Sequence, residues 1–467
     1  MPTTIPMLDL MFFLTETQDN PRHVGSVLIF KRPRSGGATV VQEIVDAYRR
    51  VKPKPPFNRV PVFRRTGLPE WREVDTFDPS HHILHLALPA PGSNEQLHQL
   101  IAELHAPMLE RHRPGWKVYV IEGLAGGRFA LYHKVHHALV DGESGMAILR
   151  KSLSDSPTDR RIRATVGEVH VSRPRPVPHG LREALEKEAR QIARRSLSVS
   201  RGSARLVESL IEGLSGYSKS RTRAFTAPYT PMNEPIYNAR SITHLVLPLP
   251  AMKSVARAWD TTLNDVALCI LDAGINRYLK AMGRMPDRPL VGLCPVSLRV
   301  DGARDATTMV SAIWPPLGPV SAPIDRRLKT IVSNTTSAKE QLRSLGKDAA
   351  YSFAVMAFAM SETLAIAQPE AMGLRPANVL ISNVRGPGET LYLNGARLEA
   401  LFPVSTLIVA IGLNVTLMSY ANKVILGFTA NGSALPEVES MARYTQEAFT
   451  ALETATTRRK ARRKTRA

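Results

Sequence analysis

The stretch HHALVDG, residues 136–142, decides which fold and which chemistry this chain is expected to have. It directly follows the apolar run FALY at 129–132, and this order predicts a strand that delivers two histidines to a turn. A histidine titrates near neutral pH, so its neutral ring can take a proton from an alcohol or a thiol. Gly142 permits a backbone conformation or a close approach that a side chain would forbid. We expect a helix to begin at about Met146.

The two histidines are expected to have different surroundings. Adjacent strand residues point to opposite faces, so His136 should pack into the fold on the side opposite to His137. Asp141 lies four residues beyond His137, where its carboxylate can orient the ring or the turn, and a structural role is expected for it. A structural alternative stays open for both rings, because paired histidines at a strand end are usually one buried and bonded, the other partly exposed.

Hydrophobic periodicity in the first half of the chain predicts a mixed α/β unit. Apolar residues from Leu97 to Met108 recur with helical spacing, which predicts an amphipathic helix over 94–110. Strands are expected at 24–30, 117–121 and 128–135, and further helices at 40–51 and 146–153.

A linker is expected to follow, because prolines interrupt regular structure over 154–180. Residues 181–214 are expected to form a helix, with leucines on an approximately common face beside many arginines, although Gly202 interrupts it. Such a helix would either lie in a bilayer interface or pack on the protein with a solvated basic face.

The pattern restarts near Ser241 and predicts a second α/β half. Strands are expected at 242–247, 290–296, 379–384, 404–413 and 423–429, and helices at 251–259 and 263–282, with two more between 324 and 367. We therefore divide the chain into an N-terminal lobe (1–153), a linker (154–235), a C-terminal lobe (236–457) and a disordered basic tail (458–467).

The chain is strongly basic, with 61 lysines and arginines against 41 aspartates and glutamates and a formal net charge of +20. The basic residues concentrate over 160–223 and 458–466. Neither segment has the interleaved aromatics of a platform for single-stranded nucleic acid. An anionic membrane or a lipid-droplet surface is therefore the expected partner, and nucleic acid is not.

Other sequence features bear on the compartment and on membrane insertion. Cys269 and Cys294 lie in apolar segments and form neither a zinc nor a disulfide pattern. The apolar start is interrupted by Asp9 and lacks a basic leader, so no secretory signal is expected. The most apolar stretch, 401–418, contains proline and glycine and predicts buried strands. We expect a cytoplasmic protein, peripheral on the inner face of the membrane or on lipid inclusions.

The HHxxxDG motif resembles the signature of the CoA-dependent acyltransferase superfamily, and the whole chain resembles the bacterial wax ester synthases/diacylglycerol acyltransferases. In four places the chain departs from the family pattern: at Gly115, where the family's PLW element has leucine, and at Arg385, Asn422 and Asn431. The matching blocks include PMLDLMFFL at 6–14, RPGW at 113–116, LNDV at 263–266, CPVSLR at 294–299, ISNVRGP at 381–387 and GLNV at 412–415.

The resemblance implies an α/β fold with mixed sheets, arranged as two chloramphenicol-acetyltransferase-like lobes with the active-site tunnel between them. It implies that His137 is the general base, supported by His136 and Gly142, and that Asp141 pairs with Arg299 to hold the turn. Further candidate supporting residues are Asn264, Asp265, Ser382 and Asn383, and all of these except Asp265 are candidate oxyanion donors. Asn264 opens a predicted helix, where N-capping would be its ordinary role.

The same resemblance implies the substrates. Acyl-CoA is the expected co-substrate, and diacylglycerol or a long-chain alcohol is the expected acceptor, giving triacylglycerol or wax ester. No metal and no bound cofactor are expected.

Two other chemistries are disfavoured by the sequence. The GESGM segment at 142–146 lacks the final glycine of a serine hydrolase's nucleophile elbow. A metal site using His133, His136, His137 and Asp141 is disfavoured because strand alternation splits the histidines, and the histidines at 81, 82 and 85 lack partners at ligand spacing. Two alternatives stay open: an acyltransferase of this fold with a non-lipid acceptor or a carrier-protein donor, and a non-catalytic lipid- or membrane-binding member.

The clustered basic residues predict salt-sensitive binding to anionic membranes. Anionic liposomes should sediment the protein at low salt and release it at high salt. Deleting 458–467 and neutralising arginines within 181–223 should reduce sedimentation. Binding that is unchanged by both alterations would contradict the prediction.

Overall fold

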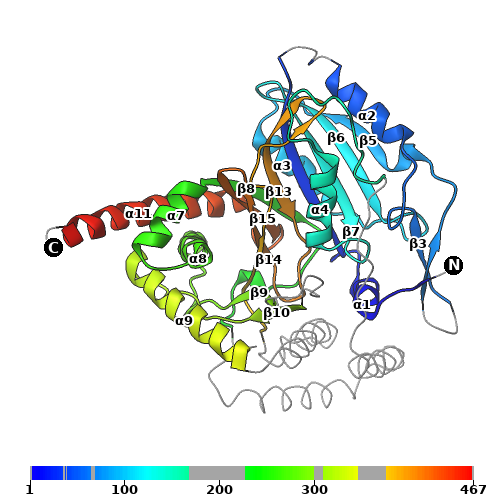
Figure 1. Ribbon diagram of the computed structural model, residues 1–467. Coiled ribbons are helices and arrows are strands. Elements are labelled where there is room, and N and C mark those ends of the chain that lie inside the picture. The colour runs from blue at the N-terminus through cyan, green and yellow to red at the C-terminus, as the bar shows by residue number, and fades with distance from the viewer. Residues whose placement is uncertain are drawn as a thin grey trace.

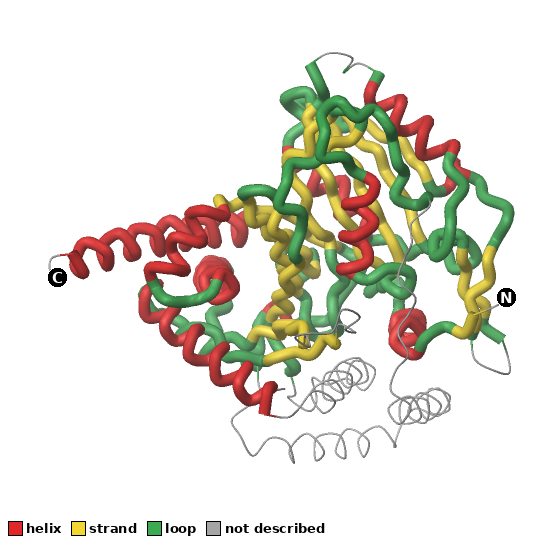
Figure 2. Tube along the Cα trace, viewed as in Figure 1, coloured by secondary structure: helices red, strands yellow, loops and turns green. Residues whose placement is uncertain are grey.

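The computed structural model describes residues 3–34, 37, 39–64, 69–167, 227–298, 309–344 and 375–464. Two six-stranded mixed sheets, each with its own helices, form two lobes (Figure 1). In Figure 2 the helices of the C-terminal lobe lie on one side of its sheet, and the last helix projects away from the lobes to the C-terminus. The expected mixed α/β class with two lobes is therefore confirmed, while the tunnel between the lobes stays a prediction.

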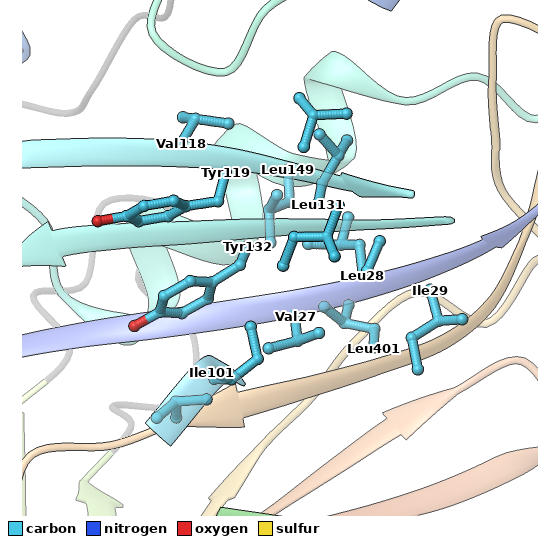
Figure 3. Packing of buried hydrophobic residues seen from close by; sticks show 14 of the residues in the cluster. Val27, Leu28, Ile29, Ile101, Val118, Tyr119, Leu131, Tyr132, Leu149 and Leu401 are labelled. Atoms are coloured by element: carbon cyan, nitrogen blue, oxygen red, sulfur yellow. The ribbon is translucent and has the colours of Figure 1, made fainter. Parts of the chain in front are cut away.

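The N-terminal lobe is built on the sheet β12-β13-β2-β7-β6-β5, in which only the β5–β6 pair is parallel. Its strands are β2 (His23–Lys31), β5 (Ile83–Ala87), β6 (Trp116–Leu124), β7 (Arg128–His136), β12 (Tyr392–Leu393) and β13 (Ala396–Val404). Tyr119 and Tyr132 stack on one face with ring centroids 5.6 Å apart, among the aliphatic side chains of the core (Figure 3).

The helices of this lobe are α1 (Met7–Thr15), α2 (Val40–Arg50), α3 (Asn94–His105) and α4 (Gly142–Ser152), with a 3-10 turn η1 (Pro79–His81). A small sheet, β1-β4-β3, joins Thr3–Thr4, Glu70–Glu73 and Arg59–Val62. A capping box between Ser93 and Gln96 fixes the start of α3. This helix ends at His105 rather than at the predicted residue 110, because Pro107 follows the C-cap residue Ala106.

The C-terminal lobe is built on the sheet β10-β9-β11-β14-β15-β8. Its strands are β8 (Arg240–Pro248), β9 (Gly292–Leu298), β10 (Met309–Ile313), β11 (Val379–Val384), β14 (Leu413–Tyr420) and β15 (Lys423–Asn431). Its helices are α7 (Leu249–Ala258), α8 (Leu263–Ala281), α9 (Ile324–Ser344) and α11 (Val438–Lys464), with a 3-10 turn η2 (Pro231–Asn233). Helix α8 is buried on nearly every side because α7, α9 and α11 pack around it.

The two halves of the sequence do not separate cleanly into the two lobes. Strand β13 pairs with β2 in the N-terminal sheet, and residues 405–412 then carry the chain to β14 in the C-terminal sheet. The assignment of all of 236–457 to the C-terminal lobe is therefore wrong for 392–404. The strand predicted at 404–413 is also wrong, because residues 405–412 form a crossover between the sheets. The apolar residues of this segment reflect burial in the crossover, where Ile408 and Ile411 are both buried.

The basic tail is helical where a disordered segment was expected. Helix α11 continues to Lys464, so the expectation is wrong for 458–464. Alanine, lysine and arginine are good helix formers. The Arg459 guanidinium lies 4.6 Å from the Trp259 ring centroid and donates to the carbonyl of Ala258 at 3.2 Å. These contacts anchor the last turns of α11 on α7.

Some predictions lie outside the described residues. They are the basic helix at 181–214, the second helix of the segment 324–367 beyond Ser344, and the partner Arg299. Within the described ranges, no helix is both long and apolar enough to cross a membrane.

The two sheets approach closely where β13 passes β15. A Cβ on Gly427 would lie 2.4 Å from the carbonyl oxygen of Pro403. We therefore expect Gly427→Ala to lower the free energy of unfolding by about 1–3 kcal/mol in urea denaturation. Gly388→Ala is the matched control, because a Cβ there would meet no atom within 4 Å. Equal unfolding midpoints for the two variants would contradict this packing.

Candidate active site

Main-chain hydrogen bonds fix the two histidines at the end of β7. The amide of His137 donates to the carbonyl of Arg22 at 2.9 Å, and the amide of His136 donates to the carbonyl of Gly115 at 2.8 Å. The amide of Leu139 then donates to the carbonyl of His136 at 2.9 Å and closes the turn. The neighbouring segments at Gly115 and Arg22 therefore fix the main-chain positions of both histidines.

Helix α1 supplies an aromatic wall for both rings. Phe12 stacks on His137 with centroids 4.2 Å apart, and Phe13 stacks on His136 at 4.1 Å. His136 is buried, whereas His137 is only half-buried. The two phenylalanines are adjacent in sequence, so one helix orients both histidines.

The tautomer of His136 follows from its contacts. The amide of Ala138 donates to Nδ1 of His136 at 3.2 Å, so Nδ1 is an acceptor and the ring N–H is at Nε2. That nitrogen faces Oε1 of Glu16 at 3.5 Å. His136 is therefore held as a structural donor next to the more accessible His137.

Glu16 is a buried carboxylate surrounded by donors. It accepts the amide of Arg22 at 3.1 Å, and a guanidinium nitrogen of Arg111 lies 3.3 Å away. Burial alone would raise the pKa of Glu16, but these donors and His136 hold it below its usual value. The charged carboxylate thereby ties α1 to the segment that leads into β2.

The electrostatics of His137 favour a neutral ring. Burial lowers its pKa to about 4, and neighbouring His136 and Arg22 act in the same direction. The charge of Asp141 and, to a smaller extent, the backbone of His137 itself oppose this shift. The ring can act as a proton acceptor at neutral pH.

Asp141 caps a helix in this structure. Its Oδ1 accepts the amide of Ser144 at 2.7 Å, so α4 begins at Gly142 and not at the predicted Met146. The Asp141 carboxylate also lies close enough to Asp9 to add to the burial that raises the pKa of Asp9 to about 7. The expected pairing of Asp141 with Arg299 stays a prediction.

Gly142 does not need to be glycine for its own backbone. Its φ is outside the left-handed region, and an added Cβ would meet no described atom within 4 Å. The described residues thus show neither a special backbone conformation nor a close approach by protein at this position, and whether a bound substrate approaches it stays a prediction.

Asn264 and Asp265 lie at the start of α8, where Thr262 and Asp265 form the N-terminal capping box. Thr262, not Asn264, is the N-cap residue: its hydroxyl accepts the amide of Asp265 at 3.2 Å. The Asp265 carboxylate accepts the hydroxyls of Thr261, Thr262 and Thr335 at 3.0, 2.6 and 2.7 Å. The Asp265 carboxylate is therefore engaged by hydroxyl donors of its own lobe. Asn264 is half-buried on the first turn of α8 and does not have the capping role expected of it.

Ser382 and Asn383 lie next to each other on β11. Asn383 is exposed, and Ser382 lies 2.7 Å from the hydroxyl of Thr416. Like Asn264 and Asp265, they belong to the C-terminal lobe, whereas His137 belongs to the N-terminal lobe. A site that used residues of both groups would lie between the lobes.

In the part of the chain that the structure describes, no group of three or more histidine, cysteine or acidic side chains is arranged to hold a metal ion. His133, proposed as one ligand of the disfavoured metal site, is buried, and burial lowers its pKa to about 4. The ring of His133 lies near the ring of Tyr48 of α2, with centroids 6.4 Å apart. Its surroundings are those of a core residue.

Sequence reasoning missed the residues that orient the histidines: Phe12, Phe13, Glu16, Arg22 and Arg111. A signal was present, since Phe12, Phe13 and Glu16 fall within one helical turn of each other in the chain's opening block. Their contact with residues 136 and 137 is a long-range pairing that local periodicity does not encode.

Comparisons with known proteins cover almost the whole chain. Residues 6–267 match the wax ester synthase/diacylglycerol acyltransferase catalytic domain, and residues 308–453 match the WS/DGAT C-terminal domain. A probable diacylglycerol O-acyltransferase of Mycobacterium tuberculosis is 34% identical over 97% of this chain and 97% of its own length. An O-acyltransferase of Acinetobacter baylyi is 29% identical, with 94% of each chain covered.

Solved structures agree with this assignment. A wax ester synthase/diacylglycerol acyltransferase from Marinobacter aquaeolei superposes with a TM-score of 0.80 at 27% identity, covering 97% of this chain and all of that one. The first condensation domain of the CDA synthetase superposes with a TM-score of 0.51 at 15% identity, covering 97% and 96%. The second likeness concerns the fold alone.

The buried environment of His137 predicts an unusual titration. Because its pKa is lowered to about 4, the ring should stay neutral from pH 8 to pH 5 and protonate only as the pH falls further. Proton NMR of the C2 resonance, identified by its loss in His137→Gln, should show no inflection between pH 5 and pH 8. An inflection near 6.5, the ordinary value, would contradict the described environment.

Proposed function

The chain belongs to the wax ester synthase/diacylglycerol acyltransferase family, and we propose that it moves a long-chain acyl group from acyl-CoA to diacylglycerol or a long-chain alcohol. It is an acyltransferase by its family, and the acceptor is our inference. The names of the mycobacterial relatives favour diacylglycerol, and that of the Marinobacter relative includes wax ester synthesis. The observation that carries the proposal is the half-buried His137, held at the end of β7 by stacking on Phe12 and by its amide bond to the carbonyl of Arg22.

The proposed reaction is a direct transfer with His137 as general base. Nε2 of His137 takes the proton of the acceptor hydroxyl while that oxygen attacks the thioester carbonyl carbon. The tetrahedral intermediate collapses as the carbon–sulfur bond breaks, and the CoA thiolate takes the proton back from the imidazolium. Base catalysis of this kind contributes roughly 100- to 10,000-fold, and positioning of both substrates contributes more.

The residues around His137 would support this step without exchanging protons. Phe12 holds the plane of the ring, and the carbonyl of Arg22 holds its main chain. His136 and Glu16 fix the adjacent residue. Asn264 and Asn383 stay candidate oxyanion donors, whereas the Ser382 hydroxyl already lies 2.7 Å from that of Thr416. Asp141 and Gly142 form the start of α4 beside the base.

The substrates suggest where the protein works. Acyl-CoA is a co-substrate rather than a bound cofactor, and some of the basic excess would suit its phosphates. Diacylglycerol and long-chain alcohols reside in membranes and lipid inclusions. We therefore propose peripheral attachment to an anionic membrane or lipid-droplet surface, through the basic residues noted in the sequence.

The test is release of free CoA from palmitoyl-CoA with dioleoylglycerol or hexadecanol. Wild-type protein should release CoA only with an acceptor, and His137→Ala should lower the rate at least about 100-fold. His81→Ala, at an exposed position, should match wild type. An active His137→Ala variant would contradict the mechanism, and no release with either acceptor would favour the non-lipid acceptor or the non-catalytic alternative.

A further inference from the structure

The crossover between the lobes is hydrogen-bonded to residues 21–22, which in turn bind the main chain of His137. The Thr406 hydroxyl donates to the carbonyl of Pro21 at 3.1 Å, and Nη1 of Arg22 donates to the carbonyl of Leu407 at 2.7 Å. The carbonyl of Arg22 is the acceptor of the His137 amide. The main chain of His137 is thus two hydrogen bonds away from the crossover at 405–407.

On its other side the crossover is held by Thr416 of β14. The Thr416 hydroxyl lies 2.7 Å from the Ser382 hydroxyl, 2.9 Å from that of Ser405 and 3.1 Å from Oδ1 of Asn414. The amide group of Asn414 donates to the carbonyl of Thr406 at 2.9 Å. The network therefore runs without a break from β11 and β14 to the crossover.

The directions of these bonds follow from the inventory of donors. Oδ1 of Asn414 can only accept, so the single proton of Thr416 goes to it. The hydroxyls of Ser382 and Ser405 must then donate to Thr416. The proton of Ser382 is consequently engaged within the lobe, which argues against Ser382 as an oxyanion donor in this arrangement.

Thr416 is the hub of the network and is 3% exposed. A valine at this position would have nearly the same shape but would leave two serine hydroxyls and the Asn414 oxygen without their shared partner. Buried polar groups that lose a partner tend to rearrange or admit water. The crossover would lose its fixed position against β14, while the packing of the sheet would be retained.

We propose that Thr416 is a positioning residue for the reaction: through Asn414 and the crossover 405–407 it holds Arg22, and thereby the ring of the proposed base His137. The proposal rests on the proposed function of His137. It assigns to a C-terminal-lobe residue the alignment of a group in the N-terminal lobe.

The first test compares Thr416→Val with Thr416→Ser and Thr445→Val. Thr445 is also buried, but the bond that its hydroxyl makes among the described residues stays within α11, to the carbonyl of Met441. Thr416→Val should lower kcat by about tenfold to 100-fold, the effect of misplacing a reacting group, with KM for palmitoyl-CoA changed by less than about threefold. Thr416→Ser should recover most of kcat, and Thr445→Val should keep it.

A double-mutant cycle tests the route. Thr406→Val removes the bond to Pro21, so Thr406→Val and Thr416→Val should be strongly non-additive in kcat, whereas Thr416→Val and Thr445→Val should be additive. A wild-type kcat in Thr416→Val, an equal loss in Thr445→Val, no recovery in Thr416→Ser, or full additivity along the route would each overturn the proposal.

A measurement without substrate separates this proposal from the proposed function. Diethyl pyrocarbonate modifies neutral imidazole, and the rate at His137 can be followed by peptide mass spectrometry. Thr416→Val should change that rate at least about threefold relative to Thr445→Val, whether or not an acceptor has been found. An unchanged rate would overturn the positioning role. An inactive wild type, or a fully active His137→Ala, would instead overturn the proposed function.

Discussion

The hydrogen bond from the His137 amide to the carbonyl of Arg22 is the interaction on which the rest of the site depends. Arg22 forms hydrogen bonds with three parts of the chain. Its amide donates to Glu16, its carbonyl accepts from His137 and its guanidinium donates to the carbonyl of Leu407. One residue thus joins the end of α1, the end of β7 and the crossover between the lobes. The ring of His137 has a defined position because these three segments share this junction.

The two adjacent histidines lie in different electrostatic environments. His136 faces a carboxylate through Nε2 and is shielded by Phe13, so it is a structural group. His137 lacks such a carboxylate contact among the described ion pairs, and burial lowers its pKa to about 4. A weakly basic ring is a modest proton acceptor. It is, however, unprotonated throughout the neutral range, which suits a step that begins with removal of a hydroxyl proton.

Local features of the fold could be predicted from the sequence. Strand β11 and the start of α2 at Val40 fall where periodicity places them, because apolar spacing reports which face of an element is buried. The apolar run over 401–418 could not be divided correctly. Burial in a strand, in a crossover and in a second sheet all require the same apolar residues, so composition does not say which sheet β13 joins.

The same limit applies to the site. The HHxxxDG motif is local and predicts a strand, a turn and two histidines. Phe12, Glu16 and Arg22 are more than 100 positions away in sequence, and Thr416 is farther still. Their roles depend on tertiary contacts, including one between lobes. Asn264 shows the converse, because a capping role that was plausible from its position belongs to Thr262, two residues earlier.

The most direct test of the central claim is a crystal structure with a non-hydrolysable acyl-CoA thioether and a long-chain alcohol bound together. The account predicts the alcohol oxygen within about 3 Å of Nε2 of His137 and close to the plane of its ring. An alcohol bound away from His137, or a ring whose Nε2 is engaged by a protein donor, would contradict it.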